Sequence, residues 1–150
     1  MKIGELAAAS DTAVETVRYY EREGLLPAPA RTDSNYRSYD GDHLARLQFI
    51  RYCRGLDMSL DEIRVLLRLK DSPHENCADV NAVLDEHIGH VSRRIRELRA
   101  LEKELGELRA QCQEAREAQD CGILERLARA SNTPKKAPAS PHLKDVHRAA

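Results

Sequence analysis

Hydrophobic positions in residues 1–70 recur at helical spacing in four short runs, which are separated by turn-forming residues. The first run begins at Ile3. Thr12 and Glu15 form a predicted capping box that opens the second helix, and Gly24, which readily adopts left-handed backbone angles, ends it. Two short helices with a tight join predict a helix-turn-helix.

An extended segment follows the second predicted helix. Pro27 and Pro29 favour an extended path, and polar turn residues then separate two short runs within 31–39. Tyr36 and Tyr39 flank a basic residue there, in a pattern typical of strands. We therefore expect a small β-hairpin, or wing, beside the helix-turn-helix.

Two more helices complete this region. The third is predicted from Asp40 to Arg54. Ser59 and Glu62 form a second predicted capping box, and the fourth helix that they open ends near Pro73.

From about Val80 to Cys112 the pattern changes to one long helix, roughly 50 Å in length at about 1.5 Å per residue. Its apolar residues alternate at spacings of four and three, which is typical of a coiled-coil seam. The seam consists of Leu84, Ile88, Val91, Ile95 and Leu98. A single helix does not bury such a stripe, so the pattern predicts a partner, most simply the same helix of a second chain.

The remaining chain holds a polar loop between Cys112 and Cys121 and a short amphipathic helix at 122–127. Beyond Ser131, scattered Pro, Lys and Ala predict a disordered tail.

The predicted fold is therefore mainly α. A winged helix-turn-helix domain with a β-hairpin wing occupies 1–70, and a long dimerisation helix, paired as an antiparallel coiled coil, leads to a metal-binding loop within 71–130. The tail takes up 131–150.

Composition narrows the function classes. The chain is 41% hydrophobic and 33% charged, with no Trp and one Phe, and this lean core favours long solvated helices. The net charge of −1 means that attraction to DNA must come from local charge placement. The sequence shows neither an apolar leader nor a run of about 18 apolar residues for a membrane span, so we expect a cytoplasmic protein. It also lacks the residue patterns of an enzyme, such as a nucleophile triad or a phosphate loop.

Four cysteines are present: Cys53, Cys77, Cys112 and Cys121. Because cytoplasmic thiols stay reduced, they indicate metal binding or redox chemistry rather than a disulfide framework. Cys53 falls in an apolar stretch of the third helix and is expected in the core.

The helix-turn-helix and wing predict a DNA-reading surface. On the second helix Thr16, Arg18 and Tyr19 can face outward, and Arg18 can bond a guanine edge or a phosphate. In the wing, Tyr36 and Arg37 supply a hydroxyl and a guanidinium for the DNA backbone. Ordinary surface charge is the alternative for any one of these residues, but their combination favours DNA binding.

Four segments of the chain resemble the MerR family of transcriptional regulators. They are residues 3–6, 16–25 (the Arg-Tyr-Tyr-Glu-Arg block), 35–39 (Asn-Tyr-Arg-Ser-Tyr) and 60–63. The resemblance covers about residues 1–130. Cys77, residues 85–88 and the Cys112…Cys121 loop resemble the lead/cadmium-responsive branch.

Three cysteines then become candidate metal ligands. Cys77 lies near the start of the long helix, where the helix dipole lowers the pKa of a thiol. Cys112 lies near the other end, so one chain does not bring both to one ion. In an antiparallel pair, Cys77 of one subunit would lie beside Cys112 and Cys121 of the other, which creates two three-sulfur sites per dimer.

Thiolates select soft or borderline cations. Three sulfurs suit Pb(II) and also Hg(II), Cd(II) would add a ligand such as water, and structural zinc normally takes four ligands. We therefore expect Pb(II) or Cd(II) as the sensed ion, with an Hg(II) sensor as the alternative and no organic cofactor. The polar surroundings of Cys112 and Cys121 argue against a role as apolar fillers.

The resemblance implies a homodimer that binds double-stranded promoter DNA and represses without metal. On binding metal it would distort the DNA so that RNA polymerase starts transcription of resistance genes. Two rivals stay open: an iron–sulfur redox sensor, which needs four ligands, and a thiolate metal-storage or chaperone protein, which has no use for a DNA-facing surface. His87 and His90 lie three residues apart on the long helix and could contact a metal, but they are rather expected to be solvated or interhelical residues beside the seam. His142 and His147 are too sparse to predict a site.

Overall fold

The computed structural model describes residues 1–74 and 76–132. The tail predicted beyond Ser131, with His142 and His147, lies outside the described residues except for its first two positions. The chain divides into two compact units, Met1–His87 and the part from Ile88 onward.

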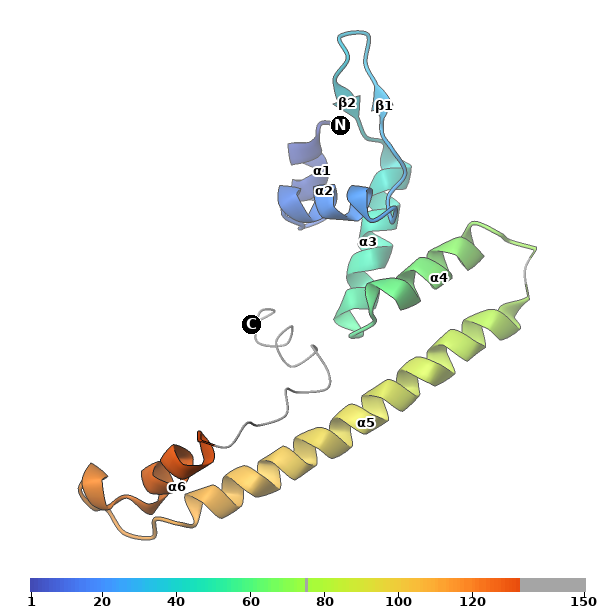
Figure 1. The fold of residues 1–150 in the computed structure, drawn as a ribbon. Helices are drawn as coiled ribbons and strands as arrows, with labels where there is room; N and C mark the ends of the chain where they lie inside the picture. The colour runs from blue at the N-terminus through green and yellow to red at the C-terminus, as the bar shows by residue number, and fades with distance from the viewer. Residues whose placement is uncertain (75, 133–150) are drawn as a thin grey trace. The chain divides into compact units, whose positions relative to one another are not determined.

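The described elements are mostly helical, as the sequence predicts (Figure 1). In chain order they are α1 (Ile3–Ala9), α2 (Val14–Arg22), β1 (Ala30–Arg31), β2 (Arg37–Ser38), α3 (Gly41–Gly55), α4 (Leu60–Lys70), α5 (Cys77–Arg109), the 3-10 turn η1 (Ala118–Asp120) and α6 (Gly122–Ala130). None of the described helices is long and apolar enough to cross a membrane.

The first unit buries one core between α1, α2, α3 and α4. Its fully enclosed residues come from each helix in turn: Leu6, Val17, Leu47, Ile50 and Ile63. Burying an aliphatic side chain contributes about 1.5–3 kcal/mol, so this core holds the helix-turn-helix together. It also fixes the outward face of α2.

The start of α2 differs from the predicted capping box. Ala13 is the N-cap, and no side chain caps the helix. Asp11 takes a positive φ of 50°, and the Thr12 hydroxyl donates to the carbonyl oxygen of Ser10 at 3.0 Å. Thr12 is thus occupied by the preceding turn, and Glu15 instead pairs with Arg18 three residues later. The other end agrees with the prediction, because Gly24 follows α2 with a φ of +73°.

The second predicted cap is confirmed. Ser59 Oγ accepts the backbone N–H of Glu62 at 3.1 Å, and a Glu62 carboxylate oxygen accepts the N–H of Ser59 at 2.9 Å. Asp40 caps α3 in the same manner through the N–H groups of Asp42 and His43. These caps fix where α3 and α4 begin, as the sequence indicates.

The long helix α5 has 33 residues and carries its apolar stripe on the surface of the single chain. The five predicted seam residues are between 39% and 60% exposed: Leu84, Ile88, Val91, Ile95 and Leu98. A stripe of this kind on an isolated helix is typical of a surface that pairs with another helix.

Candidate DNA interface and metal centre

Helix α2 presents the polar face that the sequence predicts. Val17 is fully buried, whereas Arg18 is exposed and Tyr19 is 40% exposed. Thr16 is half-buried beside them. The outward face therefore carries a cationic group and a phenolic hydroxyl, which suit contacts with base edges and phosphates.

Arg22 extends this face by one helical turn and was not among the predicted residues. Its guanidinium lies 5.9 Å from the centre of the Tyr19 ring. A cation so placed over an aromatic ring is attracted to it, so Arg22 and Tyr19 form one surface. The spacing of three residues between Tyr19 and Arg22 was the sequence signal for this pair.

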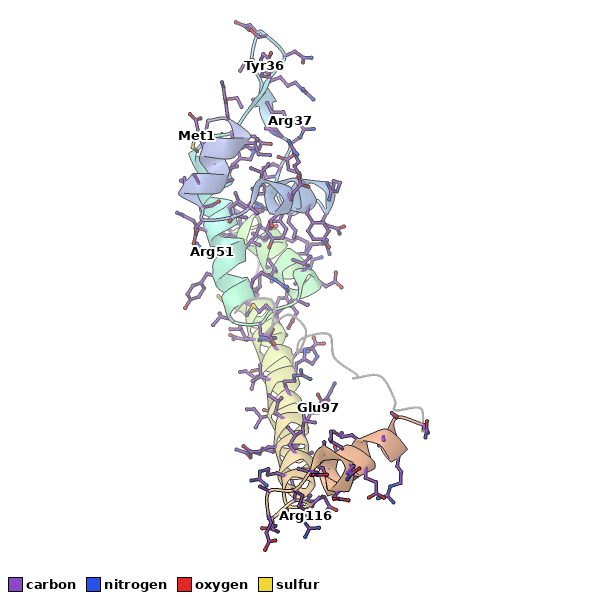
Figure 2. The ribbon with its side chains drawn as sticks, turned by 90° about the vertical axis from the view of Figure 1, so that its left-hand side faces the viewer. Met1, Tyr36, Arg37, Arg51, Glu97 and Arg116 are labelled. Atoms are coloured by element: carbon purple, nitrogen blue, oxygen red, sulfur yellow. The ribbon has the colours of Figure 1, made fainter. Side chains whose placement is uncertain are left out.

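The hairpin presents the two predicted wing residues. Ala30 pairs with Ser38 and Arg31 with Arg37 in antiparallel register, and Asn35 turns the chain with a φ of 64°. Figure 2 shows Tyr36 and Arg37 on this hairpin, with Tyr36 nearer the tip. Tyr36 is 71% exposed, so its hydroxyl is accessible to a DNA backbone.

Glu21 joins α2 to the wing, a role that sequence reasoning missed. One carboxylate oxygen accepts from the Arg37 guanidinium at 3.2 Å, and the other accepts from the Tyr39 hydroxyl. Burial raises the pKa of Tyr39, and its hydrogen bond to Glu21 raises it further. Glu21 therefore fixes the wing relative to the helix that precedes it, and it directs Arg37.

Cys112 and Cys121 come together in the second unit. Cys112 follows the end of α5, and Cys121 is the N-cap of α6. The pKa of the Cys121 thiol is lowered most by a hydrogen bond from the backbone N–H of Leu124, and desolvation partly opposes this effect. Hydrogen bonds with the backbone N–H of Ile123 and with the Cys112 side chain lower the pKa further. The loop that contains Arg116 (Figure 2) therefore brings two of the predicted ligands side by side.

Gly122 allows this loop to close. A Cβ atom at this position would stand 3.1 Å from the Gln111 carbonyl oxygen, closer than ordinary van der Waals contact. The beginning of α6 thus packs directly against the residue that precedes Cys112. A larger residue at position 122 would require the Gln111 backbone to shift by a few tenths of an ångström.

Cys77 is the third predicted ligand, and the single chain does not bring it to the other two. It begins α5 and is exposed. It lines an open hollow of about 430 Å³ together with the apolar residues Phe49, Leu66 and Val80. Cys112 lies beyond the opposite end of the same helix, as the sequence predicts.

The two adjacent sulfurs fit a soft cation, and the lowered pKa of Cys121 favours the thiolate form that binds metal. Cys112 Sγ also lies 3.1 Å from the Glu114 carbonyl oxygen, to which its thiol donates. For Pb(II) or Cd(II) two sulfurs are an incomplete shell, so such an ion would take at least one more ligand.

Cys53 is buried, as predicted, and burial raises the pKa of its thiol.

We expect Cys121 to react with iodoacetamide at pH 7.5 at least about tenfold faster than Cys53, because the thiolate is the nucleophile and Cys53 is also shielded. Variants that retain only one of the two cysteines allow each rate to be followed by mass spectrometry.

Unfolding in guanidinium chloride is the control, because the two cysteines of the unfolded chain should react with iodoacetamide at similar rates. A folded Cys53-only variant that reacts as fast as the Cys121-only variant would contradict the assigned environments.

A helix-turn-helix with an attached hairpin, followed by a long helix and a half-buried thiol pair, defines the chain as a winged DNA-binding regulator. The model of the MerR HTH family regulatory protein matches residues 1–70, and the model named MerR, DNA binding, matches residues 44–108. The chain belongs to the MerR family, and it is a metal-responsive regulator of that type.

Three relatives illustrate the likeness. The HTH-type transcriptional regulator ZntR homolog of Haemophilus influenzae is 51% identical over 109 residues, which is 73% of this chain and 81% of the relative. The transcription regulator PbrR691 from Ralstonia metallidurans CH34, solved with lead(II), is 56% identical with a TM-score of 0.75 over 85% of this chain and 98% of its own. MerR from Bacillus megaterium MB1, solved with mercury(II), is 34% identical with a TM-score of 0.61 over 85% and 99%.

Proposed function

We propose that the chain senses Pb(II) or Cd(II) and controls heavy-metal resistance genes from their promoter. The observation that carries this proposal is the pairing of Cys112 and Cys121 at the start of α6. The 56% identity to a regulator solved with lead(II) supports the choice of ion.

The third ligand in this proposal is Cys77 of the partner subunit. Its exposure at the start of α5 supports the assignment, because an exposed thiol is accessible to another chain. The exposed apolar stripe of α5 supports an antiparallel homodimer, in which each helix covers the stripe of the other. Each thiol pair then meets the partner's Cys77.

The proposed division of labour follows the sequence. Residues 1–70 bind DNA, residues 71–130 dimerise and sense metal, and 131–150 form a tail. The contacts assigned to promoter DNA come from α2 and the wing. They are made by Thr16, Arg18, Tyr19, Tyr36 and Arg37.

The dimer binds the promoter with and without metal, so the ion changes the shape of the DNA more than the affinity. Without metal the promoter is silent. With metal the two DNA-binding units shift, the DNA between them is kinked and untwisted, and RNA polymerase can engage the promoter elements. Since its target is promoter DNA, the protein acts in the cytoplasm.

Hg(II) is the second candidate ion. Three thiolates also suit mercury, and MerR from Bacillus megaterium MB1, solved with mercury(II), is 34% identical to this chain. That identity is lower than the 56% to the lead(II)-bound regulator, so we rank mercury second.

The test is transcription from the native promoter with purified protein and polymerase, in parallel with lead, cadmium, mercury and zinc salts. We expect the strongest induction by lead or cadmium, together with a footprint that stays in place while its central base pairs become reactive. Induction by mercury alone would favour the second candidate. Binding of metal without any binding to the promoter would favour a storage protein.

Substitution of the two arginines should separate their roles. We expect Arg37→Ala to weaken binding to all DNA sequences alike and to reduce the slope of log affinity against log salt by about 1. Arg18→Ala should cost about 1–3 kcal/mol on the operator and relax its specificity. Gel shifts on operator and scrambled duplexes at several salt concentrations measure both effects, and identical behaviour of the two variants would contradict the assignment.

A further inference from the structure

His87 is the only buried residue of α5, with 7% of its surface exposed. The sequence predicted a solvated or interhelical side chain here; the side chain is not solvated but lies between α5 and the elements α3 and α4. The Nε2 atom lies 2.8 Å from the Leu56 carbonyl oxygen, and Nδ1 lies 3.0 Å from a carboxylate oxygen of Glu62. One side chain of the long helix thus contacts two other elements of the first unit.

Both partners of the ring are hydrogen-bond acceptors. A ring with one proton donates to only one of the two oxygens, whereas the imidazolium donates to both. The contacts are also sheltered, because the Glu62 side chain is only 14% exposed. The hydrogen bond of Nε2 to Leu56 and the close approach of Nδ1 to the Glu62 carboxylate therefore both lie away from bulk solvent.

The two acceptors stand at structurally fixed positions. Leu56 is the C-cap of α3. Glu62 belongs to the capping box of α4, where its second carboxylate oxygen accepts from the Ser59 N–H. A displacement of His87 therefore acts directly on the turn that joins α3 to α4.

His87 is also the last residue of the first compact unit. Residues of α5 beyond it belong to the second unit, which contains the thiol pair. The α5 helix continues through this point without interruption. The contacts of His87 with Leu56 and Glu62 thus lie at the end of the first unit, where α5 continues into the second.

We propose that His87 is a positioning residue that couples metal binding to the DNA-binding unit. It transmits a displacement of α5 to the turn between α3 and α4, and it touches neither the metal nor the DNA. This inference rests on the proposed metal-induced activation. It adds the residue through which the signal enters the DNA-binding unit.

The experiment compares full-length wild type with His87→Ala and His87→Gln, and with Arg93→Ala, at an exposed position of α5, as the control. Lead(II) binding is followed by the absorbance of the lead–thiolate bond, operator binding by gel shift, and induction by transcription with lead(II). For His87→Ala we expect lead and operator affinities within about twofold of wild type and induction reduced by about tenfold, in the usual range of allosteric coupling.

His87→Gln should recover part of the induction, because its amide can donate to one of the two acceptors. Arg93→Ala should induce normally. Full induction in His87→Ala would overturn the inference, as would an equal loss in Arg93→Ala or loss of operator binding in both His87 variants. A wild type that shows no response to lead(II) would instead refute the proposed function, so the two failures are distinct.

Discussion

Cys112→Ser should reduce lead-induced transcription to the metal-free level. The substitution removes one of two adjacent sulfurs and leaves a hydroxyl, which is a poor ligand for a soft cation. Because even outer-shell changes cost 10–100-fold in metal affinity, loss of a sulfur ligand should cost more than about 100-fold. Cys121→Ser and Cys77→Ser should have the same effect, since all three sulfurs would hold one ion.

Operator binding without metal is the internal control for these variants, and it should stay unchanged. Cys53→Ala is the matched cysteine control. It removes a buried thiol of α3 and should retain induction. Retained induction after any one of the three serine substitutions would show that the site uses only the remaining two sulfurs.

Val91→Asp should convert the dimer into a monomer at micromolar concentration. Val91 lies in the middle of the exposed stripe of α5. In a symmetric dimer the change places two carboxylates in an apolar seam, where burial of an unpaired charge costs several kcal/mol. Sedimentation at several protein concentrations measures the change, and operator binding should be lost with the dimer.

Ala100→Asp is the control for this substitution, because Ala100 falls on the outer side of the heptad pattern that the seam defines. It should remain a dimer and bind the operator. A Val91→Asp variant that stays dimeric would show that subunits associate through a different surface.

The sequence predicted the helical elements well because local signals determine them. Ser59 and Glu62 form the predicted cap, and Gly24 has the positive φ that its position after α2 requires. The apolar spacing identified the core residues and the exposed stripe of α5, whose role as a dimer seam stays a prediction. Caps, helix ends and apolar spacing all depend on a residue and on neighbours only three or four positions away in the sequence.

Long-range pairings were harder to predict. Glu21 lies 16 residues from Arg37, and His87 lies 31 residues from Leu56. No periodic pattern links such residues, so the carboxylate that directs the wing and the histidine that anchors α5 both required the structure. The Thr12 cap failed for a local reason, since its hydroxyl is engaged by the Ser10 carbonyl.

The thiol site was predicted in part from the sequence and in part required the structure. Its three cysteines stand out in the sequence, and the structure brings Cys112 and Cys121 together. The position of Cys77 relative to that pair depends on a second chain. Its place in the site is therefore the central claim to test.

Mixed dimers test this claim most directly. A Cys77→Ser subunit and a Cys112→Ser subunit, each with a different tag, are co-expressed and purified through both tags. C-terminal tags are suitable, because the amino group of Met1 donates to the Tyr39 carbonyl oxygen at 2.7 Å. Lead(II) is then titrated while the lead–thiolate absorbance is recorded.

If the ligands come from both subunits, the mixed dimer has one intact set of three sulfurs, and it should bind one lead ion with the wild-type spectrum. The wild-type dimer should bind two such ions, and neither homodimeric variant should show this spectrum. If all three sulfurs came from one chain, the mixed dimer would contain no intact set. Absence of the wild-type lead–thiolate band from the mixed dimer would therefore contradict a site shared between subunits.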